Sequence, residues 1–171
     1  MKVLDHFSIP YQGLKNGLHS YQFDVDAAFF NEFENSPISN GEFVVNLELD
    51  KRSDLAIAEF DFNGTVTVNC GRCLADFDMP MDGEYTLHIK YGEAIGDEDE
   101  VMFVDPDVSS INFAQFIYES ICISLPMVVL HPDIKECDPE IIRRMSFEEE
   151  AEKSTNEIWK DLKGLNIEHN D

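Results

Sequence analysis

The sequence predicts an α+β fold, in which an antiparallel β-sheet or partly open barrel is covered by C-terminal helices. Segments that alternate apolar and polar residues with period two all precede residue 92, whereas apolar residues at helical spacing gather after residue 109. The 171 residues are 43% hydrophobic and include 13 Phe, enough apolar material to build a core. We expect a single domain over residues 1–137 and an acidic helical tail over residues 138–171.

Four segments have the alternation that is typical of strands with one buried face and one solvated face. In chain order they cover residues 20–25, 42–50, 65–70 and 84–91.

A hairpin is predicted before the third of these segments, because Asn63-Gly64 is a strong turn signal. A two-residue loop would place Asp61 beside Val66. A three-residue loop over residues 62–64, with Gly64 in the left-handed conformation, pairs Phe60 with Val66 instead. We favour the second register because it keeps one face of the hairpin apolar.

Two longer helices are predicted late in the chain. Ser109 or Ser110 can cap the first helix, which Pro126 stops. Asp138-Pro139-Glu140 is typical of the start of the second, with an N-cap, a proline in the first turn and an acid near the positive end of the helix dipole. A shorter helix is predicted over residues 27–33, and residues 156–165 have helical spacing that could dock on the body or on a partner. The apolar residues of the first helix are Phe113, Phe116, Ile117, Ile121 and Leu125, and those of the tail include Trp159, Leu162 and Leu165.

The charge excludes several classes of partner. Lys and Arg number 12 against 35 Asp and Glu, so the formal charge is 12 − 35 = −23. Only two basic residues, against sixteen acidic ones, lie between Ser53 and Ile134. Such a chain repels phosphate backbones, which argues against direct nucleic-acid binding and against anionic membranes.

The expected location is the cytoplasm. Residues 1–11 lack the uninterrupted apolar stretch of a secretory signal. The longest apolar region, residues 121–130, is interrupted by Ser124 and Pro126 and is about half the length that a membrane span needs.

The most specific local motif is Cys70-Gly71-Arg72-Cys73, since two thiols two residues apart on a tight turn can bind one metal ion. His131 and Cys137 form the only plausible second pair, which would complete a Cys₃His site for a structural zinc ion. The alternative is that Cys70 is a small buried apolar residue, Cys73 a turn residue, and His131 and Cys137 ordinary loop residues.

Catalysis is not expected. A redox role for the two cysteines is weakly supported, because such pairs usually sit at a helix N-terminus and this one lies between predicted strands. Phosphate-binding glycine loops and the nucleophile motif of hydrolases are missing from the sequence. We therefore expect a protein that is not an enzyme.

Taken in order, these motifs resemble a known family. Cys70-x-Arg72-Cys73-Leu74 closes a strand, an acidic loop follows, and an apolar helix runs into Leu125-Pro126. This arrangement resembles the YceD family of large ribosomal RNA subunit accumulation proteins. The tail, with Trp159, Leu162 and Leu165, resembles the C-terminal end of members from Bacteroides-like bacteria.

The resemblance implies a non-enzymatic cytoplasmic protein that supports accumulation or processing of large-subunit ribosomal RNA. Many members carry several cysteines just after the Leu-Pro motif, whereas this chain has His131 and Cys137 there. Combined with the charge, the resemblance predicts a basic ribosomal protein or an assembly intermediate as the partner. The alternative is a small zinc-stabilised interaction module without a ribosomal role.

Overall fold

The structure is a computed structural model that describes residues 3–92, 101–105 and 107–152. The chain divides into two compact units, one of residues 1–68 and 76–128 and one of residues 69–75 and 129–171. Its elements in order are η1 (Val3–Phe7), β1 (Ser8–Ile9), β2 (Gly17–Val25), α1 (Ala27–Phe30), β3 (Gly41–Lys51), β4 (Leu55–Asn69), β5 (Asp76–Tyr91), β6 (Val101–Val104), β7 (Ile111–Asn112), α2 (Ala114–Ile123), η2 (Ile134–Glu136) and α3 (Pro139–Glu152).

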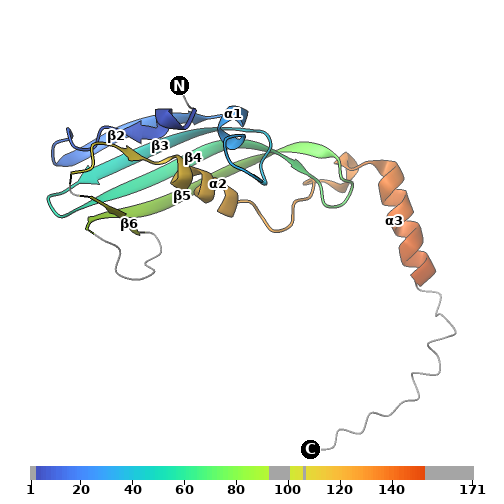
Figure 1. The fold of residues 1–171 in the computed structure, drawn as a ribbon. Coiled ribbons are helices and arrows are strands. Elements are labelled where there is room, and N and C mark those ends of the chain that lie inside the picture. Colours follow the sequence, from blue (N-terminus) through green and yellow to red (C-terminus); the bar gives the residue numbers. More distant parts are fainter. Residues whose placement is uncertain (1–2, 93–100, 106, 153–171) are drawn as a thin grey trace, which may run out of the picture. The chain divides into compact units, whose positions relative to one another are not determined.

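The first unit is built on a five-stranded sheet in the order β2-β3-β4-β5-β6, with β1 and β7 forming a separate pair (Figure 1). Strands β2, β3 and β4 pair antiparallel, whereas β6 joins β5 in parallel. The sheet is therefore mixed rather than wholly antiparallel, and it does not close into a barrel because β2 and β6 are its two edges. The predicted α+β class is confirmed.

The hairpin predicted at Asn63-Gly64 is wrong, because both residues lie inside the uninterrupted strand β4. Gly64 lies opposite Phe43 of β3. A Cβ atom on Gly64 would be 2.7 Å from the Phe43 Cα and would overlap the Glu42 carbonyl oxygen. Glycine serves here to let two backbones approach closely, which is its other use in a strand. The apolar face assigned to this segment is nonetheless the inward one, because residues on both sides of the supposed turn keep the same parity in a continuous strand.

One face of the sheet, called the inner face below, carries the core. Phe7 of η1 packs on Phe23 of β2 and Phe29 of α1, with ring centroids 5.4 and 4.6 Å apart. Helix α2 packs on the same face, where the Phe60 ring lies 4.9 Å from that of Phe116. Full burial of each aromatic ring contributes about 1.5–3 kcal/mol, so covering this face by η1, α1 and α2 is a large part of what holds the unit together.

The helices begin where local caps allow. The predicted Ser109 or Ser110 cap is wrong: β7 intervenes, and α2 starts at Ala114, whose N–H donates to the Asn112 side chain at 2.9 Å. Helix α3 begins as predicted, with the Glu140 N–H donating to the Asp138 carboxylate. Helix α1 is shorter than residues 27–33. The predicted tail helix over residues 156–165, with Trp159, Leu162 and Leu165, lies outside the described residues. Among the described helices, none combines the length and apolar character needed to cross a bilayer.

Candidate metal centre and acidic sheet face

The second unit brings together the four residues that the sequence singled out as metal ligands. Cys70 and Cys73 come from the turn that follows β4, and His131 and Cys137 come from the segment around η2. All four side chains are buried, and one ligand atom from each lies within 4.8 Å of the other three. The cluster could therefore hold a metal ion.

The turn after β4 brings the sulfurs of Cys70 and Cys73 within 4.8 Å of each other. The Leu74 N–H donates to the Cys70 carbonyl at 2.8 Å, and the Arg72 N–H donates to the Cys70 sulfur at 3.4 Å. Leu74 has φ 63°, in the left-handed region that non-glycine residues rarely adopt, and its side chain is 74% exposed. Because the Leu74 side chain is exposed, its burial does not offset the backbone strain. We infer that the strained conformation serves the geometry of the turn itself.

The second pair of ligands reaches the turn through backbone contacts. The Gly71 N–H donates to the Val129 carbonyl at 2.8 Å, and the His131 N–H donates to the Cys70 sulfur at 3.4 Å. The single turn of η2 then returns Cys137 to the side of His131. Backbone hydrogen bonds thus fix the two halves of the cluster against each other.

The electrostatics of the cluster favour a negative sulfur at Cys70. Burial raises the pKa of the Cys70 thiol, but hydrogen bonds from the backbone N–H groups of His131, Cys73 and Arg72 outweigh that effect and lower the pKa to about 5. Burial raises the pKa of Cys137 as well, opposed by the Arg72 guanidinium, whose Nη1 lies 3.5 Å from the Cys137 sulfur. Hydrogen bonds therefore sustain one thiolate, whereas a second thiolate beside it needs a positive partner.

The remaining motif residues lie in the first unit. Leu125 packs against the core and Pro126 follows the end of α2. Cys122 lies on α2, outside the cluster, and burial raises its pKa.

A second feature lies on the sheet face opposite the core, called the outer face below. The polar half of the alternation in β2–β5 places exposed carboxylates there, while exposed Lys90 of β5 adds a cation. The sequence places the acidity in the middle of the chain, but the common face emerges only when strand parity is combined with strand order. The exposed carboxylates are Asp24, Glu42, Glu48, Glu59, Asp61, Asp76, Asp78, Asp82 and Glu84.

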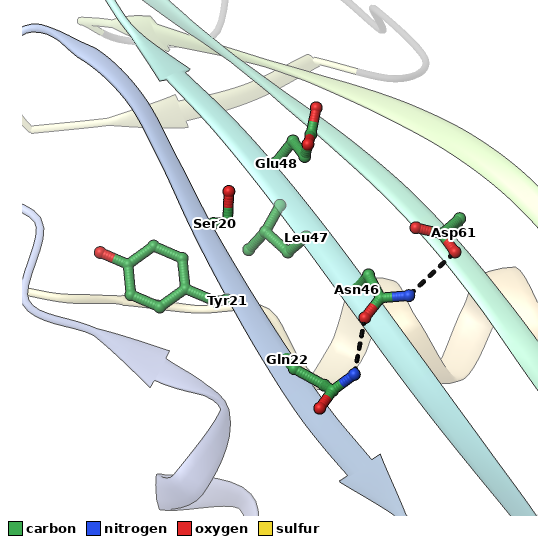
Figure 2. A pocket seen from close by; sticks show the side chains of 7 residues that line it. All are labelled: Ser20, Tyr21, Gln22, Asn46, Leu47, Glu48 and Asp61. Carbon is green, nitrogen blue, oxygen red and sulfur yellow. Dashed lines mark hydrogen bonds between the residues drawn. The ribbon is translucent and has the colours of Figure 1, made fainter.

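The outer face is hollowed where β2, β3, β4 and β5 lie side by side. Figure 2 shows one hollow, in which Gln22 donates to Asn46 at 2.9 Å and Asn46 donates to Asp61 at 3.0 Å. The neighbouring hollow is lined by four carboxylates: Glu48, Glu59, Asp61 and Glu84. Glu48 lies directly opposite Glu59 in the β3/β4 register. Like charges directly opposite each other on a sheet are destabilising, so this surface suits a cationic ligand.

Comparison with known proteins identifies the family. A family model described as "Large ribosomal RNA subunit accumulation protein YceD" matches residues 58–166, more than half of the chain. No curated protein and no solved structure matches. The matched span includes all four residues of the Cys/His cluster and the acidic strand β5. The chain therefore belongs to the YceD family.

Proposed function

We propose that this chain is a non-enzymatic cytoplasmic protein that supports accumulation of large-subunit ribosomal RNA and ribosome assembly by binding a basic ribosomal protein. The description of its family supports the link to ribosomal RNA. The exposed carboxylates on the outer face of the sheet support a basic partner.

The observation that carries the proposal is the sign of the charge on that face. The hollow lined by Glu48, Glu59, Asp61 and Glu84 would repel the phosphates of RNA and attract Lys and Arg side chains. A basic ribosomal protein that is not bound to RNA exposes many Lys and Arg side chains. The chain would hold the basic protein of an assembling large subunit rather than the RNA itself.

The first experiment captures partners from a lysate treated with ribonuclease, with the intact chain immobilised. We expect basic ribosomal proteins, identified by mass spectrometry, to bind at low salt and to be released as salt rises, because exposed charges are screened beyond about 8 Å at physiological ionic strength. A face variant, Glu48→Gln/Glu59→Gln/Glu84→Gln, should lose this capture.

The matched control removes the same charge elsewhere in the first unit. Glu32→Gln/Glu34→Gln/Glu119→Gln changes three exposed residues outside the sheet, on α2 and after α1. This control should capture as wild type does. Equal capture by the face variant, or capture that disappears with the RNA, would contradict the proposal.

The second experiment is a gradient profile of ribosomal particles from a strain that lacks the gene. The proposal expects a deficit of large subunits, restored by the wild-type chain and not by the face variant. An unchanged profile counts against any ribosomal role.

A second candidate function is a zinc-stabilised protein-interaction module without a ribosomal role. Exposed apolar side chains in the second unit favour it: Leu74, Leu130 and Ile134 are 74, 38 and 53% exposed, and they neighbour the buried cluster in sequence. In this reading the metal is a structural zinc ion. Stoichiometric zinc together with an unchanged ribosomal profile would favour this candidate over the first.

A further inference from the structure

The second unit lacks an apolar core in its described part. The hydrophobic core cluster and the partly buried residues packed on it all lie within residues 1–68 and 76–128. Over residues 69–75 and 129–145, only Cys70, Cys73, His131 and Cys137 are buried. Small folded units that cannot build a core are usually held by disulfides or by a metal. The cysteines are free thiols, so a metal ion is the link that these four buried side chains could provide.

Three of the distances inside the cluster match those of ligands around one ion, and all four ligand atoms lie within 4.8 Å of one another. The His131 Nδ1 atom lies 3.5 Å from both the Cys73 and the Cys137 sulfur, and the Cys70 and Cys137 sulfurs are 3.9 Å apart. With Zn–S of about 2.3 Å and Zn–N of about 2.0–2.1 Å, a tetrahedron separates two sulfurs by about 3.8 Å and a sulfur from a nitrogen by about 3.6 Å. A disulfide would need sulfurs at about 2.05 Å.

We propose that the second unit folds around one zinc ion bound by the sulfurs of Cys70, Cys73 and Cys137 and by Nδ1 of His131, with the Arg72 guanidinium as its outer cation. Four buried protein ligands fill a tetrahedral shell and leave no position for substrate, so the ion is structural. Three thiolates and Zn²⁺ sum to −3 + 2 = −1. Arg72, 3.5 Å from the Cys137 sulfur, offsets that charge.

The backbone around the cluster supplies the outer shell that such sites have. The Cys70 sulfur accepts the N–H groups of Arg72 and His131, both at 3.4 Å. Donors of this kind orient a thiolate toward its metal and spread its charge. The proposal goes beyond the ribosomal role, because the ion would be needed whatever the partner.

The test is metal analysis of the full chain purified under reducing conditions. We expect one zinc per chain, released when the thiols are modified, and a cobalt-substituted form with the visible absorption of tetrahedral thiolate coordination. Zinc near zero with all four thiols freely titratable would overturn the proposal. So would a Cys70–Cys137 disulfide in the native protein.

Variants locate the ion. Cys73→Ser should lose the zinc, whereas Cys122→Ser, which removes the one cysteine outside the cluster, should keep it. If Cys73→Ser does not fold, the zinc count and cobalt spectrum of the wild-type chain still decide. Arg72→Gln should keep the zinc but bind it about 10-fold more weakly, as loss of an outer-shell partner does. If Arg72→Gln binds zinc with the wild-type affinity, Arg72 does not contribute to the site.

Amide NMR measures separately whether the second unit stays folded after zinc is removed. Chelation should collapse the signals of residues 69–75 and 129–145 while those of the first unit persist. Loss of zinc without change in these signals would overturn the folding role. None of these readouts depends on a ribosomal partner, so failure here and failure of the proposed function are distinguishable.

Discussion

Neutralising the opposed carboxylates on the outer face should make the protein more stable. Glu48 and Glu59 are direct cross-strand partners, and both are exposed. Taking their carboxylates as about 5.5 Å apart in water, the repulsion is about 0.75 kcal/mol without added salt. Screening lowers it to about 0.4 kcal/mol at 0.15 M salt and about 0.1 kcal/mol at 1 M. We expect Glu48→Gln/Glu59→Gln to gain stability by about these amounts.

The assay is urea unfolding of the first unit, followed by far-UV circular dichroism over a range of salt concentrations. Glu42→Gln is the control, because Glu42 lies on the same strand and face but opposite Thr65 rather than a carboxylate. The control should change stability less than the double variant at low salt. The reasoning is refuted if the double variant is no more stable than wild type at low salt, or if its gain is as large at 1 M.

Two further predictions concern the core. Gly64→Ala should destabilise the first unit by about 3 kcal/mol in urea unfolding, because the added Cβ would collide with the backbone of β3. The control Gly13→Ala, with open space around it, should stay within about 1 kcal/mol of wild type. Equal unfolding midpoints for the two variants would contradict the close approach of the two backbones at Gly64. Burial, and then the hydrogen bond to Tyr91, raise the pKa of Tyr11, so its contribution to stability is complete below about pH 10 and is lost as the pH rises through the folded-state pKa. Tyr11→Phe should therefore flatten the loss of stability between pH 9 and 11 in urea titrations, and an unchanged slope would count against this cause.

Alternation predicted strands within β2, β3, β4 and β5, because it reports which face of a sheet is buried, but it did not predict the short strands β1, β6 and β7. It could not distinguish a turn from a close approach at Gly64, since glycine permits both and the deciding neighbour, Phe43, lies 21 positions earlier in the chain. The start of α2 was missed for a similar reason. Its first N–H is satisfied by Asn112, which pairs in β7, whereas the expected serine caps lie before that strand.

The four residues of the Cys/His cluster could be proposed from sequence because thiols and imidazoles are scarce in this chain. Their arrangement could not, since it depends on the positive φ of Leu74 and on the hydrogen bond from Gly71 to Val129. Neither of these is encoded by spacing. Likewise, the carboxylates of the outer face are far apart in sequence, and only strand order and register place Glu48 opposite Glu59.

The placement of charge on the outer face argues for binding rather than for solubility alone. Solubility needs net charge but not carboxylates facing one another across strands, where repulsion lowers the stability of the fold. At the end of β3 the chain does place opposite charges together, because Arg52 forms an ion pair with Asp50 at 2.8 Å. At Glu48 and Glu59 it instead keeps two carboxylates in register beside Asp61 and Glu84. Lys and Arg side chains of a partner would relieve that repulsion on binding. The same carboxylates that lower the stability of the free chain would therefore favour binding of a basic protein.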